Sequence, residues 1–299
     1  MQRKSTDEKP RVSICIPTYN RSASLSKCLT SVLNQDYVNL EIIITDNCSS
    51  DGTETLVTSL LEEHQNIRYI RNPTNIGSSA NFNRAKDLAT SQYFMWLADD
   101  DWISDNYVSA CMEYMLAHDD TVMVSGAGVH VKDNHSWKGE YISILNSNRY
   151  FRFLSYYFFI NDNSFFYGII NTEKVELLEL ENKSGNDCHF IAAIAYQGKI
   201  KTVPEANVYR SVAGVSSSMS NAAKQWGEPW WVQREPYLGM AVGAYQSTIR
   251  DDNVFGKESL LLRHVIGCAA CGWLVAKKVI ARRIYHALGK PFQSEHIIE

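Results

Sequence analysis

The first third of the chain alternates short apolar runs with longer amphipathic stretches. Four apolar runs of strand length occupy residues 12–16, 41–45, 67–70 and 93–97. After each of the first three, apolar residues recur every three or four positions, which is the spacing of one helix face. One such series is Leu25, Cys28, Leu29, Val32 and Leu33. The alternation predicts a mostly parallel sheet wrapped by helices.

Polar residues follow each of these predicted strands directly. They are residues 17–21 after the first, 46–47 after the second, 75–77 after the third and 99–101 after the fourth. In open α/β sheets, ligands bind beyond the carboxyl ends of parallel strands, where helix N-termini direct amides at anions. The pattern therefore predicts one binding site along one rim of the sheet.

Three consecutive aspartates, Asp99, Asp100 and Asp101, are the most unusual of these segments. Adjacent carboxylates repel one another unless a positive charge neutralises them. Hard cations take oxygen ligands and share them with substrate phosphates. We therefore expect Asp99 and Asp101, which have Asp-x-Asp spacing, to bind Mg²⁺ or Mn²⁺. The alternative is a solvated acidic turn in which Asp101 caps a following helix.

Taken together, these motifs resemble a known family. Val-Ser-Ile-Cys-Ile-Pro-Thr-Tyr-Asn-Arg, Glu-Ile-Ile-Ile-Thr-Asp-Asn-Cys-Ser-Ser-Asp-Gly-Thr, Asn-Ile-Gly with Asn81, and Leu-Ala-Asp-Asp-Asp are similar, in order and spacing, to the nucleotide-binding half of family 2 glycosyltransferases. The resemblance covers residues 11–130 and implies an α/β GT-A fold, a Rossmann-like and mostly parallel twisted sheet with flanking helices. It implies that Asp46 accepts a hydrogen bond from the nucleotide base and that Asp99 and Asp101 belong to the metal motif that bridges the diphosphate.

The resemblance also implies a set of nucleotide-binding residues on the rim. They are Pro17, Thr18, Tyr19, Asn20, Arg21, Asp46, Asn47, Asn75, Gly77, Asn81, Asp99 and Asp100.

The catalytic base is expected in the less regular second half. A helix is predicted near residues 173–180, a second from 185–187 to Gly198, and a strand near 203–212. An inverting transfer needs a base within reach of the acceptor hydroxyl, from an element on the opposite side of the sugar. Gly185-Asn186-Asp187 is similar to the family's acidic pair before a helix, with Asn186 in place of the first acid. Asp187 is the predicted base, and the alternative is that it only caps its helix.

Other residues of this half remain weaker candidates. Asp162 and Glu173 could also serve as the base, while His189 more often has a packing role than a catalytic one at such a position. Many relatives carry a histidine two residues after an arginine as a further metal ligand. This chain has Val212 there, after Arg210 and Ser211.

The 299 residues, 45% of them hydrophobic, suit one large domain with an appendage. We expect a catalytic domain over residues 1–220, with a nucleotide-binding half at 11–130 and an acceptor half at 131–220. A helical region at 221–299 would follow. Aromatic residues crowd positions 150–167; core packing is the expected use for most of them, and sugar stacking or lipid contact is the alternative.

The composition of the last predicted helix suggests that it binds a membrane surface. Its cations are Lys277, Lys278, Arg282, Arg283 and Lys290, and apolar residues lie among them. This composition is typical of an interfacial helix on anionic lipid. It is also typical of a soluble helix with a solvated charged face and a buried apolar stripe.

Charge and cysteine content limit the partners and the compartment. The net charge of -4 provides no global basic field, so no nucleic-acid partner is expected. No signal peptide and no window of about 20 apolar residues is apparent, so the chain is not expected to cross a bilayer. The seven cysteines lie mostly at apolar positions, which favours a reduced, cytoplasmic protein. Cys268 and Cys271 are expected to be buried small hydrophobes rather than a metal or redox pair.

The resemblance implies transfer of a hexosyl or deoxyhexosyl group from a nucleotide-sugar donor to a saccharide or polyprenyl-linked saccharide. It further implies inversion, metal dependence and a role in bacterial surface polysaccharide (O-antigen or capsule) assembly, with the protein cytoplasmic or peripheral on the inner membrane face. A non-catalytic saccharide-binding relic of the GT-A fold is the main rival. A nucleotidyltransferase is disfavoured because residues 17–21 contain no glycine. The donor sugar, the nucleotide base, the acceptor, the linkage and the oligomeric state are left open.

Overall fold

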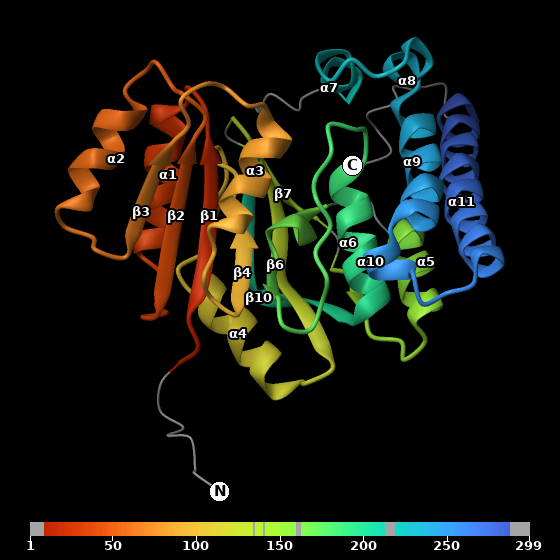
Figure 1. The fold of residues 1–299 in the computed structure, drawn as a ribbon, viewed down its shortest axis with the longest axis horizontal. Coiled ribbons are helices and arrows are strands. Elements are labelled where there is room, and N and C mark those ends of the chain that lie inside the picture. The colour runs from red at the N-terminus through yellow and green to blue at the C-terminus, as the bar shows by residue number, and fades with distance from the viewer. Residues whose placement is uncertain (1–8, 134, 140, 160–162, 213–218, 288–299) are drawn as a thin grey trace, which may run out of the picture.

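The computed structural model describes residues 9–133, 135–139, 141–159, 163–212 and 219–287. Within these residues the strands form a mixed sheet in the order β3-β2-β1-β4-β9-β6-β10-β5, with β7 beside β6 and β8 beside β10. Helices cover the sheet, and a group of helices stands at one end of the molecule (Figure 1).

The nucleotide-binding half forms as the hydrophobic pattern predicts. The parallel strands β1 (Val12–Thr18), β2 (Leu40–Asp46), β3 (Ile67–Arg71) and β4 (Tyr93–Trp96) follow one another with helices between them. The helices are α1 (Ser22–Leu33), α2 (Thr53–Leu61) and α3 (Ser78–Asp87). Every residue of β1, β2 and β4 is buried, as expected for strands covered on both faces.

The second half extends the same sheet. Its elements are β5 (Trp102–Ile103), α4 (Tyr107–Ala117), β6 (Thr121–Lys132), β7 (His135–Lys138), β8 (Ser143–Ile144), α5 (Arg149–Phe159), the 3₁₀ turn η1 (Ser164–Tyr167), β9 (Ile169–Asn171), α6 (Asn186–Gln197) and β10 (Lys199–Ser211). Strand β9 runs antiparallel to both β4 and β6, and β6 runs parallel to β10. The carboxyl ends of β1 to β4, β6 and β10 therefore lie along one rim.

The prediction of a helix at residues 173–180 is wrong, because this segment consists of turns and irregular chain. Its backbone groups bond to side chains of neighbouring helices instead of to one another. Leu180 donates its amide to Asn83 of α3 at 2.9 Å, and its carbonyl accepts from the same side chain at 2.9 Å. The amide of Glu176 donates to Gln197 of α6 at 2.7 Å. These long-range bonds replace the helical ladder.

The C-terminal region is helical, as predicted. It contains α7 (Met219–Gln225), α8 (Trp230–Arg234), α9 (Pro236–Arg250), α10 (Asp252–Phe255) and α11 (Leu260–Ala287). One apolar cluster runs from Trp96 of β4 through Phe190 of α6 to Leu274 of α11. The helices therefore share a core with the sheet, and the proposed division after residue 220 falls inside α7.

Helix α11 corrects two expectations. Residues 260–281 have a mean hydropathy of 1.4, so this helix is long and apolar enough to cross a membrane by length and composition alone. The expectation that no stretch qualifies is wrong, because a few cations interrupt the run without lowering its average enough. Cys268 is exposed rather than buried, because it falls on the outward side of α11. Cys271 is half-buried, and the described cysteines are free thiols.

Candidate functional site

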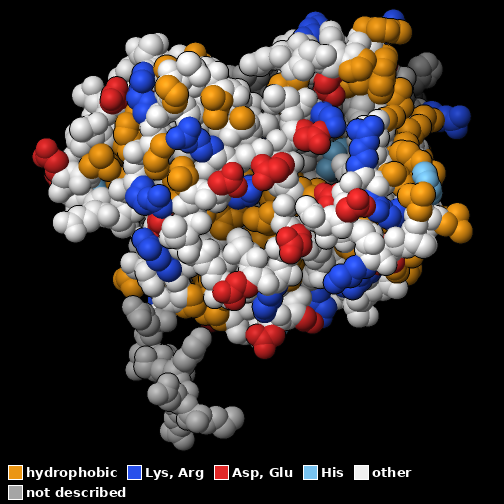
Figure 2. Space-filling model, viewed as in Figure 1, with side chains coloured by type: hydrophobic (Ala, Val, Ile, Leu, Met, Phe, Trp, Pro, Cys, Tyr) orange, Lys and Arg blue, Asp and Glu red, His pale blue; other side chains and the backbone are white. Residues whose placement is uncertain are grey.

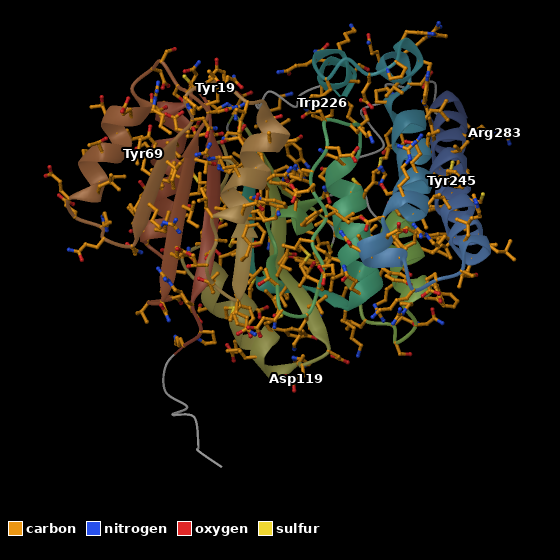
Figure 3. All side chains as sticks on the ribbon, in the orientation of Figure 1. Tyr19, Tyr69, Asp119, Trp226, Tyr245 and Arg283 are labelled. Carbon is orange, nitrogen blue, oxygen red and sulfur yellow. The ribbon has the colours of Figure 1, made fainter. Side chains whose placement is uncertain are left out.

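The loops after β1 and β2 are hydrogen-bonded to each other. The amide of Asn20, a residue with φ of 52°, donates to the hydroxyl of Ser49 at 2.9 Å, and its side-chain oxygen accepts the Ser50 amide at 2.7 Å. Asp51 accepts the first amide of α1, from Ser22, at 2.9 Å. These bonds fix the loop of residues 17–21, Pro17 included, and leave Tyr19 at the rim with 44% of its surface exposed (Figure 3).

Asp46 lies at the end of β2 and is fully buried. One carboxylate oxygen accepts the Tyr69 hydroxyl at 2.6 Å, and the other accepts the Ser49 amide at 2.8 Å. The Arg71 guanidinium stands 3.6 Å away. Both oxygens thus have protein partners. A bond from Asp46 to a nucleotide base stays a prediction, and it requires one of these oxygens to accept a second hydrogen bond or to exchange its partner.

A network of asparagine side chains holds the β3–α3 loop against the end of β2. Asn47 donates to Asn75 at 2.8 Å and to the carbonyl of Gly77 at 3.2 Å, and Asn72 donates to Asn47 and Asn81 at 3.1 and 3.0 Å. Gly77 has φ of 90°, which favours glycine. Asn47 and Asn81 are buried, so we propose that they fix the start of α3 rather than contact a ligand directly.

Asp99 and Asp100 share a guanidinium. Asp99 is buried and accepts bonds from the Thr18 hydroxyl at 2.7 Å and from Arg21 at 2.9 Å. The same Arg21 nitrogen lies 2.7 Å from Asp100. Burial raises the pKa of Asp99, and the Arg21 charge opposes that rise. The structure therefore supplies from Arg21 part of the positive charge that the acidic segment requires.

Asp101 connects the end of β4 to the end of β10. It is buried and accepts the Tyr167 hydroxyl and, at 2.7 Å, the Ser211 amide. Burial and the Asp100 carboxylate raise the pKa of Asp101 to about 6. The alternative that Asp101 caps a helix is wrong, because α4 begins later and its N-cap is Asn106.

The donor chemistry of this segment fits a shared metal ion. The described residues contain no group of three or more histidine, cysteine or acidic side chains that could enclose an ion. Mg²⁺, however, is held by one or two carboxylates together with substrate phosphates. The carboxylates of Asp99 and Asp101 suit such an ion, while Val212, whose apolar side chain cannot act as a ligand, adds nothing to the site.

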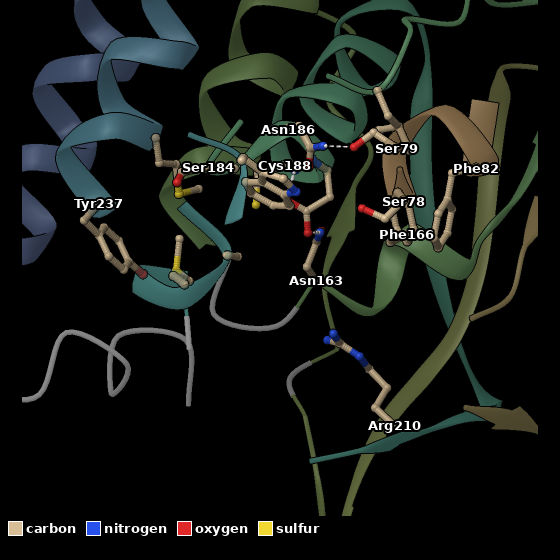
Figure 4. Close-up of a pocket in the computed structure, with 17 residues that line it drawn as sticks. Ser78, Ser79, Phe82, Asn163, Phe166, Ser184, Asn186, Cys188, Arg210 and Tyr237 are labelled. Carbon is tan, nitrogen blue, oxygen red and sulfur yellow. Dashed lines mark hydrogen bonds between the residues drawn. The ribbon is translucent and has the colours of Figure 1, made fainter. Parts of the chain in front are cut away.

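A cavity of about 380 Å³ adjoins this rim (Figure 4). Its wall comes from the start of α3, from η1, from the start of α6, from β10 and from α7 and α9. Lining side chains include Ser78, Phe166, Asp187, Arg210, Trp226 and Tyr237. Arg210 also lies 5.8 Å from the ring of Tyr167, which bonds to Asp101. Arg210 and Tyr167 thus link the wall of the cavity to the acidic segment, which does not itself line the cavity.

Asp187 faces this cavity from the first turn of α6. Its carboxylate accepts the Cys188 amide at 2.9 Å and the Asn163 amide nitrogen at 2.6 Å. The N-cap of α6 is Gly185, not Asp187. Gly185 has φ of 77°, and a Cβ there would lie 2.5 Å from Met240. The glycine allows α9 to approach, so that the base candidate and α9 line the same cavity.

Asn163 is a site residue that sequence reasoning missed. Besides donating to Asp187, it accepts a short hydrogen bond from the Tyr156 hydroxyl. A polar residue inside the aromatic segment was an available signal, because a buried amide needs hydrogen-bond partners. Of the alternative bases, Glu173 is exposed and outside the cavity lining, and Asp162 lies outside the described residues.

His189 has a packing environment, as expected. It is 6% exposed, and its Nδ1 pairs with the Tyr157 hydroxyl at 2.8 Å. Its Nε2 has no hydrogen-bond partner among the described residues and abuts α9 at Gly243, where a Cβ would lie 2.5 Å from that nitrogen. Burial lowers the pKa of His189 to about 3. The imidazole is therefore neutral, and it borders a smaller cavity of about 230 Å³ rather than the one that Asp187 faces.

This burial predicts an acid-sensitive fold. In the unfolded chain His189 binds a proton below pH about 6.5, whereas in the folded chain it does so only below pH about 3. As the pH falls through this window, the free energy of unfolding therefore decreases by about 1.4 kcal/mol for each pH unit. We expect His189→Gln to flatten this slope. Urea unfolding between pH 5 and 7 measures it, with His135→Gln, at an exposed histidine, as the control. Equal slopes in the wild type and His189→Gln would contradict the assignment.

The sequence profile of Glycosyl transferase family 2 matches residues 13–177, which is more than half of the chain. The chain belongs to the family 2 glycosyltransferases. This confirms the resemblance that the rim motifs indicated.

Several curated relatives match over shorter segments. A GalNAc(5)-diNAcBac-PP-undecaprenol beta-1,3-glucosyltransferase of Campylobacter jejuni is 35% identical over 35% of this chain and 34% of its own length. Abequosyltransferase RfbV of Salmonella typhimurium is 32% identical over 46% and 40%. The putative colanic acid biosynthesis glycosyl transferase WcaA of Escherichia coli is 39% identical over 36% and 38%. The matches thus cover between about a third and two fifths of these relatives.

Solved structures share the fold over nearly the whole chain. S. aureus TarS 1-349 in complex with UDP-GlcNAc aligns with a TM-score of 0.57 at 18% identity, over 96% of this chain and 88% of that one. The mannosyltransferase PcManGT from Pyrobaculum calidifontis, in complex with GDP-Man and Mn²⁺, aligns with a TM-score of 0.54 at 15% identity, over 95% and 80%. The predicted GT-A fold with a helical C-terminal region is confirmed.

Proposed function

We propose that this family 2 glycosyltransferase moves one sugar from a nucleotide-sugar donor to a saccharide or polyprenyl-linked saccharide, with inversion and with a divalent metal. The observation that carries the proposal is that two side chains connect the acidic segment to the wall of the cavity. Asp101 bonds to Tyr167, Arg210 lies over the Tyr167 ring, and Arg210 lines the cavity that Asp187 faces. A donor on the acidic segment would thus present its sugar toward this cavity.

The acidic segment would serve the leaving group. Departure of the sugar leaves negative charge on the nucleoside diphosphate, which preorganised positive charge stabilises in the transition state. Asp99 and Asp101 would hold Mg²⁺ or Mn²⁺, which acts as a Lewis acid on phosphate oxygens. Arg21, already paired with Asp99 and Asp100, adds a fixed charge beside the same phosphates.

Asp187 would serve the acceptor. Inversion requires a base that removes the proton of the acceptor hydroxyl on the side of the sugar opposite the diphosphate. Asn163 fixes one carboxylate oxygen of Asp187 at 2.6 Å, which orients the group. The cavity volume of about 380 Å³ is within the usual range for small-molecule sites. Phe166, Trp226 and Tyr237 give it aromatic faces on which a sugar ring can stack.

The biological setting is proposed from the relatives. The Campylobacter jejuni relative is named for an undecaprenol diphosphate-linked saccharide, and the Escherichia coli relative for colanic acid biosynthesis. We infer a role in bacterial surface polysaccharide assembly, with the protein in the cytoplasm or on the inner membrane face. The two solved structures carry different nucleotides, so the base of the donor is left to experiment.

The second candidate function is that of a non-catalytic saccharide-binding relic of the GT-A fold. Asn186, which replaces an acid, donates to the carbonyl of Glu181 and accepts a hydrogen bond from the Asp187 amide at 2.6 Å, so it stabilises the local backbone.

We expect one class among UDP-, GDP-, CDP- and dTDP-sugars to raise the melting temperature in the presence of Mn²⁺, because a ligand of the folded state stabilises it. We further expect that donor to release its nucleoside diphosphate, and EDTA to stop the release. Binding without turnover, with all acceptors tried, would favour the relic.

A further inference from the structure

Helix α11 is apolar on its outward side as well as on the side that packs in the core. A soluble amphipathic helix turns its apolar stripe inward and its charges outward. The outward stripe of α11 is instead apolar and exposed over five turns, at Leu261, Val265, Cys268, Val275, Val279 and Ile280. Only 28% of the residues in this apolar stretch, 260–281, are buried, although its mean hydropathy is 1.4.

Two of the three Lys and Arg residues of this stretch, Arg263 and Lys278, are buried against the protein, and Lys277 is half-buried. Arg263 is 6% exposed, bonds to Asp252 at 2.6 Å and donates to the Thr248 carbonyl at 2.9 Å. Lys278 is 9% exposed and pairs with Glu235 of the turn before α9. The residues described as exposed between 260 and 281 are therefore all uncharged, and Arg283 is exposed near the helix end (Figure 3).

Neighbouring helices widen this apolar face. On one side, Phe158 of α5 stacks on Trp273 with ring centroids 3.5 Å apart, and Phe158 and Phe159 are 48% and 55% exposed. On the other side, Leu238 of α9 shares an apolar groove of about 200 Å³ with Val275. Helix α11 forms the outer margin of the molecule, and Figure 2 shows apolar side chains gathered along that margin. A patch of this kind marks a protein or membrane contact.

We propose that the exposed face of α11, flanked by α5 and α9, docks in the plane of an anionic lipid bilayer. This inference rests on the proposed function. The bilayer is favoured over a protein partner because residues 260–281 have the hydropathy of a membrane segment and aromatic rings lie at the edge of the exposed stripe. A basic end, with exposed Arg283, suits anionic headgroups.

The packing of α11 selects an in-plane position over a transmembrane one. Its inner side packs against α9 and also contacts α5. A spanning orientation would pull Arg263 from Asp252 and Lys278 from Glu235 and place both cations in hydrocarbon, which is costly. An in-plane helix buries only its outward stripe and keeps both ion pairs.

Docking on this face would bring the proposed acceptor site to the bilayer. Tyr237 of α9 lines both the cavity that Asp187 faces and the groove that Val275 borders on α11. A saccharide carried on a membrane lipid could then reach Asp187 without leaving the bilayer. The surface thus favours the polyprenyl-linked class of acceptor over a free saccharide.

Flotation of the full chain with lipid vesicles tests the proposal. We expect the wild type to float with vesicles of phosphatidylglycerol and phosphatidylcholine, and less with phosphatidylcholine alone. The double variant Val265→Glu/Val275→Glu should lose about tenfold or more of this binding, because buried apolar area governs interfacial affinity. Val38→Glu, at a residue that is 87% exposed in the α1–β2 loop, is the matched control and should float like the wild type.

Several outcomes would overturn the proposal. Docking through this face would be rejected if the double variant floated as well as the wild type, or if the wild type did not float at all. A dimer of the wild type in light scattering, absent in the double variant, would assign the face to a second copy of the chain. Resistance of the bound wild type to carbonate extraction would reject the in-plane orientation. The melting-temperature shift by a nucleotide sugar should be unchanged in the double variant, which shows that it is folded and separates failure of docking from failure of the proposed function.

Discussion

Replacing Asp187 by Asn is expected to lower sugar transfer by about 10²–10⁴-fold while leaving donor affinity nearly unchanged, because general base catalysis contributes about that factor. The amide keeps the shape of the side chain, and its single oxygen can accept one of the two bonds that Asp187 accepts from Cys188 and Asn163. It cannot take the proton of an acceptor hydroxyl. Single-turnover transfer and donor binding, measured on the same preparations, separate the two effects.

Glu173→Gln is the matched control for this experiment. Glu173 is the alternative base of the second half, but it is exposed and outside the cavity lining. We expect its variant to transfer sugar like the wild type. Retained turnover in Asp187→Asn would reject the base assignment, and loss of turnover in Glu173→Gln would move the assignment to that residue.

Asp99→Asn is expected to lower transfer by about 10²–10³-fold, the effect typical of losing one electrostatic contact to a developing charge. The amide can still accept from Thr18, and it removes one of the two negative charges beside Arg21. If Asp99 holds a metal ion, the part of nucleotide affinity that depends on Mn²⁺ should disappear as well. Titration of the nucleotide with and without Mn²⁺ measures that part.

Asp105→Asn provides the control, since Asp105 is an exposed carboxylate a few residues farther along the same segment. It should bind nucleotide and respond to Mn²⁺ like the wild type. An unchanged Mn²⁺ effect in Asp99→Asn would show that the metal is held elsewhere, or that Arg21 alone neutralises the segment.

The structure also shows where local reasoning stops. The positive charge beside Asp99 and Asp100 comes from Arg21, which lies 78 residues away from Asp99 in the chain. The sequence predicted a cation at the acidic segment, but it could not show that a guanidinium already supplies part of the charge. Asn163 was missed for the same reason, because its partner Asp187 is on another element.

The amino-acid sequence by itself determined the alternation of strands and helices, the rim on which the polar loops gather, and the family. These features follow from periodicity and from short motifs, whose physical basis is local: side-chain spacing on one face, and turns that specific residues allow. The tertiary structure alone decided that residues 173–180 form no helix, that Asp46 has both oxygens occupied, and that α11 exposes its apolar stripe while Arg263 and Lys278 turn inward. Each of these depends on partners far away in the chain, which no local pattern specifies.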